Sequence, residues 1–407
     1  MKKVLLTICL CLGIFYVCSI PSYAENKVIV IDAGHGGDNL GAQVNDIVEK
    51  EITLKVAKAM YDRLSLYEGV DVYMTREEDK GLSLKQRAII AKDYDADYMI
   101  ALHFNASESH LLYGTECWVP FDNFYEETYT LATYFIDEMT GLGLYNRGIK
   151  TRLNDDGDNY YGIIRESEKR DIPCLLVEHC HLDNENDIGY YETDEKLKKL
   201  GILDADALAK YLGLSSKVLG VDYSNYSLEV TIPHSENTRD KTGPDECAIT
   251  LKEYDNTNGN ACVILTARED DSSLLYYDYS IDGGITFSER FPLTSENIEF
   301  TLEMEDGTKP DIVVRAYSLN DAYTVSNNLV LEEVCYPTPE ESVTTISLNL
   351  KEQQKAEKRE KLLSFFVLVM VLLSLCFVVV FTLYFVKLTR RRKRRKRKHQ
   401  TQRKTLK

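Results

Sequence analysis

Across residues 27–214, short apolar runs alternate with segments whose apolar residues recur at helical spacing. A short apolar run is typical of a buried strand, whereas recurrence every three or four residues is typical of an amphipathic helix. Strands and helices in alternation predict an α/β domain with a mixed or largely parallel sheet flanked by helices. The expected strands are 28–31, 70–74, 98–102 and 174–177, and the expected helices are 51–66, 82–93, 124–139 and 195–212.

After residue 215 the pattern changes to alternating apolar and polar positions between turns rich in Asn, Asp, Gly and Pro. Such short strands predict an all-β sandwich over residues 221–335. The segment 279–284 is similar to turns in bacterial immunoglobulin-like repeats, and the sandwich is either a plain spacer or a binding element. The expected strands are 227–232, 248–254, 262–267, 274–281, 298–304, 312–319 and 329–334.

An uncharged, mostly apolar run of 25 residues covers 362–386. Because about 20 residues suffice for a helix to cross a bilayer, this run predicts one C-terminal transmembrane helix. The polar segment 336–361 before it is rich in Glu, Lys and Gln in its second half, and we expect it to form a helical or flexible stalk.

Charge is distributed unevenly around this span. The whole chain has a net charge of −17, yet residues 387–407 contain 13 basic and no acidic residues. A basic block next to a span is typical of the cytoplasmic side of a membrane. We therefore expect a short basic cytoplasmic tail that meets anionic lipid headgroups and binds no nucleic acid.

The first 24 residues show a second targeting signal. Lys2 and Lys3 precede an apolar stretch, and the small residues Ser22 and Ala24 follow it. This order is typical of a secretory signal peptide cut after Ala24, with an uncleaved anchor as the alternative. Together the two segments predict a single-pass membrane protein with an extracellular body.

Cysteines are too sparse in that body for a disulfide framework, so we expect ordinary hydrophobic cores. A bridge between Cys247 and Cys262 is one option. However, a hairpin turning at residues 256–259 would place Cys262 opposite Glu253 instead.

Two of the seven histidines, His35 and His103, come just after predicted strands. Strand ends gather at one edge of an α/β sheet, where ligands bind. The glycines around His35 let the backbone turn sharply. Two imidazoles with one carboxylate and an open fourth position would form a catalytic zinc site, although either histidine alone is as often structural.

Several segments, taken in chain order, carry a family resemblance. Over residues 27–214 the chain resembles the zinc-dependent N-acetylmuramoyl-L-alanine amidases of the type-3 family. The matching segments are 28–37, 49–57, 75–76 with 84–88, the residues around His103, 146–150 and 173–178.

This resemblance implies that His35, Glu49 and His103 bind Zn²⁺ and that Glu178 is the catalytic acid and base. Zinc would lower the pKa of water toward about 7, and Glu178 would pass a proton from that water to the departing amine. The implied reaction is hydrolysis of the amide bond between N-acetylmuramic acid and L-Ala in peptidoglycan.

The chain departs from the family pattern in two places. Ala33 stands where the family usually has Pro, and His179 and His181 follow Glu178 where the family tends to have small residues. If the strand continued, both histidines would lie on the face opposite Glu178. We expect substitutions at the rim of the cleft, with extra metal ligands or substrate contacts as alternatives.

Other polar residues have open roles. Asp32 and Asn105 are close in sequence to the ligands and are candidates for orienting them. Four arginines could meet either substrate carboxylates or partners in surface ion pairs: Arg76, Arg87, Arg147 and Arg165.

The favoured hypothesis is a membrane-anchored bacterial amidase that acts on peptidoglycan. The alternative is a catalytically silent amidase-like protein for cell-wall binding or adhesion, and another metal-dependent amidohydrolase is a third reading. Glu178 favours the enzyme, because a pure binder has no need for an acid and base. The sequence identifies no regulatory protein partner.

Overall fold

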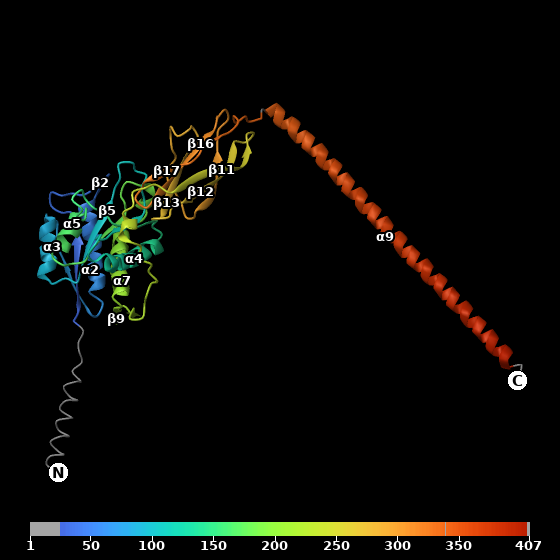
Figure 1. Cartoon of the computed structure of the whole chain (residues 1–407), viewed down its shortest axis with the longest axis horizontal. Coiled ribbons are helices and arrows are strands. Elements are labelled where there is room, and N and C mark those ends of the chain that lie inside the picture. Colours follow the sequence, from blue (N-terminus) through green and yellow to red (C-terminus); the bar gives the residue numbers. More distant parts are fainter. Residues whose placement is uncertain (1–24, 338, 405–407) are drawn as a thin grey trace, which may run out of the picture. The chain divides into compact units, whose positions relative to one another are not determined.

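The computed structural model describes residues 25–337 and 339–404, so the expected signal peptide lies outside the described residues. The described chain forms two compact units (Figure 1). One holds the residues up to Asp255 together with Gly259–Val334. The other holds Asn256–Asn258 and the chain from Cys335 onward.

A six-stranded mixed sheet forms the centre of the α/β domain, in the order β4-β1-β5-β8-β6-β7. Neighbours among the first four strands are parallel, whereas β6 is antiparallel to β8 and parallel to β7. The mixed sheet expected from the sequence is confirmed, but β6 and β7 were not predicted. The strands are β1 (Lys27–Ala33), β4 (Val70–Met74), β5 (Tyr98–Asn105), β6 (Thr115–Trp118), β7 (Asn146–Lys150) and β8 (Cys174–His181).

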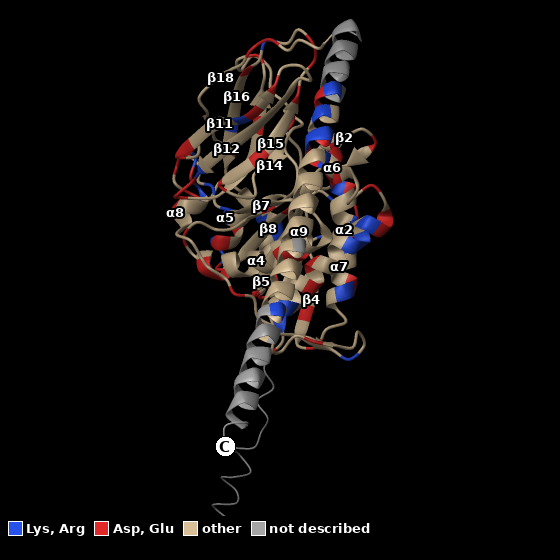
Figure 2. Cartoon of the chain, turned by 90° about the vertical axis from the view of Figure 1, so that its right-hand side faces the viewer, with Lys and Arg blue, Asp and Glu red and all other residues tan. Residues whose placement is uncertain are grey.

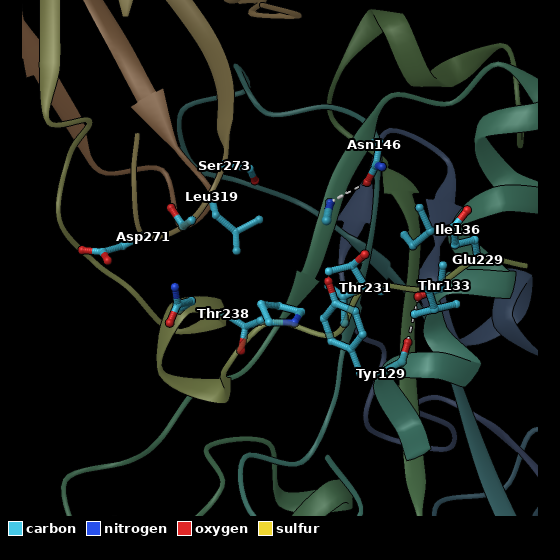
Figure 3. Close-up of a pocket in the computed structure, with 16 residues that line it drawn as sticks. Tyr129, Thr133, Ile136, Asn146, Glu229, Thr231, Thr238, Asp271, Ser273 and Leu319 are labelled. Carbon is cyan, nitrogen blue, oxygen red and sulfur yellow. Dashed lines mark hydrogen bonds between the residues drawn. The ribbon is translucent and has the colours of Figure 1, made fainter. Parts of the chain in front are cut away.

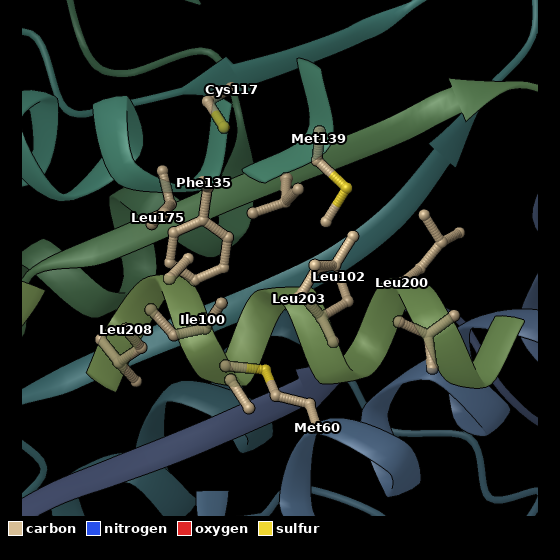
Figure 4. Packing of buried hydrophobic residues seen from close by; sticks show 14 of the residues in the cluster. Met60, Ile100, Leu102, Cys117, Phe135, Met139, Leu175, Leu200, Leu203 and Leu208 are labelled. Carbon is tan, nitrogen blue, oxygen red and sulfur yellow. The ribbon is translucent and has the colours of Figure 1, made fainter. Parts of the chain in front are cut away.

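Helices cover both faces of this sheet. Helices α2 (Glu49–Leu64), α4 (Tyr125–Leu142) and α7 (Asp194–Tyr211) share the larger hydrophobic core on one face. Helices α3 (Leu84–Asp93) and α5 (Gly162–Glu168) pack on the other face. Figure 4 shows leucines of α7 packed against side chains of β5 in the larger core. Full burial of such a side chain contributes about 1.5–3 kcal/mol.

The ends of the helices follow from local capping. Ser83 and Gln86 form a capping box at the start of α3, and Thr193 caps α7. Helix α4 ends at Gly143, which adopts a φ of 112° that favours glycine. Three shorter elements, the hairpin β2 (Gln43–Val44) and β3 (Ile47–Val48) and the helix α6 (Glu185–Ile188), complete the domain.

Two antiparallel sheets follow and share one hydrophobic core, which contains Val263 and Leu302 from one sheet and Tyr277 and Val314 from the other. We refer to them as the β-sandwich. The first sheet contains β11 (Glu246–Asp255), β12 (Asn260–Arg268) and β15 (Asn297–Glu303). The second contains β13 (Leu274–Ser280), β14 (Phe291–Pro292), β16 (Asp311–Ser318), β17 (Tyr323–Val325) and β18 (Leu329–Val330).

The expected strand over residues 227–232 is wrong. This segment forms no strand. It runs along α4 instead, where the Leu228 N–H donates to the Tyr134 hydroxyl at 3.2 Å. Leu228 also packs against the larger core of the α/β domain. The segment between β10 (Val221–Asp222) and α8 (Ser235–Thr238) is therefore a connection lying on the α/β domain. Leu228 and Val230 are partly buried there without a strand partner, and Ile232 is exposed.

The hairpin β11–β12 places Cys262 opposite Glu253, as expected from the turn. Cys247 pairs with Ala267, and all six cysteines with described side chains are free. The optional bridge between Cys247 and Cys262 is thus absent.

A long helix, α9 (Pro339–Lys404), runs through the stalk and the apolar segment without a break. Among the described residues, its stretch Lys351–Lys387 is the one helix long and apolar enough to cross a membrane. Its large side chains are exposed, for example Phe377 at 71%. Figure 2 shows basic residues near both ends of the uncharged run 362–386 within it. At 1.5 Å per residue, 25 residues extend about 37 Å, enough for a hydrocarbon core of about 30 Å.

The close packing of α7 on α2 predicts that Gly201→Ala destabilises the protein. A Cβ at Gly201 would lie 2.3 Å from the Val56 carbonyl oxygen and 2.8 Å from the Met60 nitrogen. We expect a loss of about 1–3 kcal/mol, although alanine has a higher helix propensity by about 1 kcal/mol. The measurement is urea unfolding of the full chain in detergent, followed by the fluorescence of Trp118, the only tryptophan.

Gly141 provides the matched control, because it lies in α4 with nothing within 4 Å of an added Cβ. Gly141→Ala should leave stability equal or slightly higher. Equal stability of the two variants would contradict the close packing of the two helices.

Candidate active site

A left-handed turn directly after β1 carries His35. His35, Gly36 and Gly37 adopt φ values of 60°, 127° and 58°. A Cβ at Gly36 would lie 2.3 Å from the Lys80 carbonyl oxygen, so glycine is needed there. The turn brings the His35 ring to the carboxyl edge of the sheet, where His103 lies two residues before the end of β5.

Glu49 is the first residue of α2 and is held by two backbone groups. Its Oε2 accepts from the Ala42 N–H at 2.8 Å, and its Oε1 accepts from the Phe104 N–H at 3.1 Å. Burial raises the pKa of Glu49, but hydrogen bonds from His103 and His35 lower it more, so the net pKa lies below the ordinary value. The carboxylate is therefore ionised at neutral pH.

Three donor atoms converge at this edge. Oε1 of Glu49 lies 2.9 Å from Nε2 of His35 and 3.0 Å from Nδ1 of His103, and the two nitrogens are 3.1 Å apart. Tetrahedral zinc ligands at about 2.0–2.1 Å from the ion would lie about 3.3 Å from one another. Within the described residues this is the one cluster of its kind. The spacing and chemistry of the donors fit a zinc ion.

Neighbouring groups orient the three side chains toward this point. Asn39 Oδ1 lies 2.9 Å from His35 Nδ1, so a proton on Nδ1 leaves the lone pair of Nε2 free. A Cβ at Gly34 would lie 2.4 Å from the His103 ring, and one at Gly41 would lie 2.5 Å from Glu49 Oε2. The absence of side chains at both glycines thus makes room for the ligands.

Glu178 lies beside this cluster, because β8 pairs with β5 so that Glu178 is opposite His103. Its Oε2 atom is buried and has no hydrogen-bond partner among the described residues. Burial, followed by the negative charges of Glu49 and Glu116, raises the pKa of Glu178 well above its ordinary value. A carboxyl group with a raised pKa holds a proton more readily than an ordinary glutamate does.

The two histidines after Glu178 are fully buried, so neither lies at the rim of a cleft. Ring nitrogens of His179 lie 3.0 Å from the His103 carbonyl oxygen and 2.9 Å from Asp204 Oδ2, on the side of α7. His181 pairs with Asn105 across a bulge in β8.

The bulge inserts an extra residue and reverses the alternation of side chains, so His181 shares the face of Glu178. The expectation that His179 and His181 both lie opposite Glu178 is correct for His179 and wrong for His181. Neither residue joins the cluster of the three ligand candidates.

The residues expected to orient the ligands have other roles. Asp32 accepts hydrogen bonds from Thr75 and Arg87, and Asn105 donates to Glu116, so neither contacts a ligand ring. Asn39 was missed, although its place four residues after His35 in a glycine-rich turn is a usable signal.

The arginines separate into two groups. Arg76 and Arg87 donate to backbone carbonyls of the turn between β1 and His35, and Arg147 is buried in a network described below. Arg165 lines a cleft of about 540 Å³ with His35, His103 and Lys85. The side chains of His35 and His103 keep 21% and 18% exposure, so this cleft gives access to the ligand candidates.

Comparison with known proteins finds amidases among the relatives of this chain. The family model described as N-acetylmuramoyl-L-alanine amidase matches residues 29–210. The chain is 31% identical over 189 residues to N-acetylmuramoyl-L-alanine amidase CwlM of Bacillus licheniformis, covering 46% of this chain and 69% of that protein.

A second relative is the sporulation-specific N-acetylmuramoyl-L-alanine amidase of Bacillus subtilis, at 29% identity over 187 residues, or 46% of this chain and 68% of that protein. A solved structure, the catalytic domain of the amidase CwlV from Bacillus (Paenibacillus) polymyxa, is 28% identical. It aligns with a TM-score of 0.40 over 46% of this chain and 98% of that one.

The contact between Gly34 and the His103 ring predicts the effect of Gly34→Ala. The added Cβ would displace the ring, and we expect the affinity for zinc to fall about 10- to 100-fold, the range seen when support for a ligand is lost. The measurement is zinc binding by the full chain in competition with a chelator. Gly189→Ala is the control, because its backbone is helical and nothing lies within 4 Å. Unchanged affinity of Gly34→Ala would exclude His103 as a ligand.

Proposed function

The chain belongs to the N-acetylmuramoyl-L-alanine amidase family, and from this we propose that it is a membrane-anchored, zinc-dependent hydrolase of peptidoglycan. The bond cleaved is the amide between N-acetylmuramic acid and L-Ala. The observation that carries the proposal is the carboxyl group of Glu178 beside the cluster of His35, Glu49 and His103, with its Oε2 atom buried and without a hydrogen-bond partner among the described residues. Burying such an atom without a partner destabilises the fold, and a protein that only binds the wall would gain nothing from it.

His35, Glu49 and His103 would hold the zinc ion. When bound there, zinc supplies a Lewis acid for the scissile carbonyl and lowers the pKa of water toward about 7. Backbone N–H groups of Ala42 and Phe104 hold the Glu49 carboxylate in its place. This carboxylate therefore needs little rearrangement on binding, which favours a preorganised site.

Glu178 performs the proton transfers in this proposal. Its carboxylate takes a proton from the water that attacks the amide carbon. The resulting carboxylic acid gives that proton to the nitrogen of L-Ala as the C–N bond breaks, so that the products are a carboxylic acid on the lactyl group and a free amine on L-Ala. Ionisation of the new carboxylic acid then releases one proton. A raised pKa suits both steps, because the group must accept and release a proton near neutral pH.

The cleft offers positive charge to the substrate. Lys85 and Arg165 line it close to His35 and His103. Stem peptides of peptidoglycan are acidic, and guanidinium groups pair well with carboxylates. We assign these two residues to binding of the stem peptide.

The apolar stretch of α9 anchors the enzyme in this proposal. The acidic body lies outside the cell and the basic tail inside, following the bias of basic residues toward the cytoplasm. The anchor keeps the hydrolase close to the wall of the cell that produces it.

Substitution of the proposed acid and base predicts a large loss of rate. Glu178→Gln keeps the size of the side chain but cannot carry a proton, so kcat should fall by about 10²–10⁴. The measurement is release of free amino groups from purified peptidoglycan by the full chain in detergent, with zinc content determined in parallel. A chelator should abolish wild-type activity, and added zinc should restore it.

Glu51→Gln is the matched control, because Glu51 is exposed on α2 two residues after Glu49. It should retain activity and zinc. Wild-type turnover by Glu178→Gln would refute the mechanism, and an inactive, zinc-loaded wild-type chain would refute the amidase function.

If α9 is the membrane anchor, truncation of the C-terminus should decide whether the chain is found in the membrane fraction. A chain ending at residue 361 should leave the membrane fraction, whereas one ending at residue 388 should remain in it. Protease added to intact cells should remove the body of the full chain and spare the tail. Extraction of the full chain by alkaline carbonate would contradict a membrane span.

A further inference from the structure

A buried arginine joins the α/β domain to the β-sandwich. Arg147 lies on β7 and is only 2% exposed. Its Nε donates to Glu116 Oε2 at 2.8 Å within the α/β domain. Its Nη2 donates to Asp321 Oδ2 at 2.8 Å, and its Nη1 donates to the Tyr276 hydroxyl at 3.2 Å, both in the β-sandwich. One guanidinium group therefore uses partners from both parts of the chain.

The surrounding junction is packed and largely aromatic. The rings of Tyr113, Tyr145 and Tyr276 pack against one another at tilted angles, with ring centroids 4.9–5.4 Å apart. The Tyr276 hydroxyl donates to the Tyr113 carbonyl, and the Tyr145 hydroxyl donates to the Leu275 carbonyl. These contacts exclude water from Arg147. Because the effective dielectric constant is lower there than in water, the ion pairs of Arg147 interact more strongly.

A cavity of about 330 Å³ beside this junction is also lined by both parts. Figure 3 shows Tyr129 and Ile136 of α4 on one side of it, and Asp271 and Leu319 of the β-sandwich on the other. Gly148, next to Arg147, permits the approach of Leu319, since a Cβ there would lie 2.5 Å from it. The β-sandwich is thus fitted against β7.

Glu116, the partner of Arg147 within the α/β domain, connects Arg147 to the strands of the candidate active site. Its Oε2 also accepts from Lys150 Nζ at 2.7 Å, and its Oε1 accepts from the side chain of Asn105 at 2.9 Å. Glu116 is opposite Glu178 in the pairing of β6 with β8, so the two carboxyl groups share a face of the sheet. Asn105 lies two residues after His103. Glu116 is therefore tied to both strands that carry the proposed chemistry.

Resting on the proposed amidase function, we infer that the β-sandwich is a positioning part of the active site. Asp321 and Tyr276 hold Arg147, and Arg147 holds Glu116 beside Glu178. Neither β-sandwich residue touches substrate, so both act through Arg147.

The charge balance explains why the β-sandwich is needed. Glu116, Arg147, Lys150, Arg290 and Asp321 contribute two negative and three positive charges to one network. Without Asp321 the three positive charges face the single carboxylate of Glu116, and this imbalance draws water in or moves Arg147. Asp321 adopts a φ of 62°, a left-handed conformation that Asp adopts more readily than most residues, and from this turn its carboxylate accepts from Arg147.

The test is Asp321→Asn in the full chain in detergent, assayed on purified peptidoglycan. We expect kcat to fall by about 10- to 100-fold, the cost of a small misplacement of a reacting group. KM and zinc content should remain within about twofold, because Asp321 does not line the cleft and its ion-pair partners are Arg147 and Arg290, not the ligand candidates. Tyr276→Phe, which removes only a hydroxyl group and disturbs folding less, should lower kcat in the same direction.

Asp278→Asn is the matched control. Asp278 is buried in an ion pair with Arg315 and accepts from Tyr317, both within the β-sandwich. This variant weakens the β-sandwich without removing a partner of Arg147, so it should keep the wild-type kcat.

Three outcomes would overturn the inference: wild-type kcat in both Asp321→Asn and Tyr276→Phe, an equal loss of kcat in Asp278→Asn, or a loss that appears only in KM. An inactive wild-type chain would instead refute the proposed function, so the two failures are distinguishable.

Discussion

Two imidazole nitrogens and a carboxylate oxygen meet at 2.9–3.1 Å, although they come from three separate parts of the chain. Donor atoms so close together need a proton or a cation between them. Three features allow this close approach. They are the left-handed turn at His35, the backbone hydrogen bond to Glu49, and the absence of side chains at Gly34 and Gly41. The carboxyl edge of the parallel strands is where such a meeting is easiest, because the strands end side by side.

A second constraint is the burial of charge next to that edge. Glu116 and Arg147 occupy strand positions that would ordinarily hold apolar residues, and they are stable there only because every charge has a partner. One of those partners, Asp321, lies in the β-sandwich. The matched family model ends at residue 210, so it does not include this contact. The α/β domain and the β-sandwich look separable along the sequence, but they share this buried network of charges.

The remaining helix, α9, exposes an apolar surface. Side chains along the apolar stretch of α9 are exposed, and nothing in the described protein covers them. A bilayer would remove this surface from water, which is the usual fate of such a segment. Under the proposed topology the acidic body has little attraction for anionic wall polymers, so the anchor keeps the enzyme near its substrate.

Local patterns were sufficient for elements whose burial repeats regularly. The strand over residues 70–74 agrees with β4 residue for residue, and the strands 98–102 and 174–177 are β5 and β8 without their polar ends. The candidate ligands His35 and His103 were recognisable because chemistry and neighbouring glycines coincide at predicted strand ends. Glu49 and Glu178 depended on the family resemblance, since an isolated glutamate carries no local signal.

Strands β6 and β7 escaped prediction because charged residues, among them Arg147, fill positions that face the interior. The face of His181 depends on a bulge, and the segment 227–232 alternates like a strand but lies on α4. The sequence by itself thus determined the order of the elements and the kinds of chemistry. Only the tertiary structure decided which charges are buried together, because Arg147 and Asp321 are 174 residues apart and no local pattern encodes such a partner.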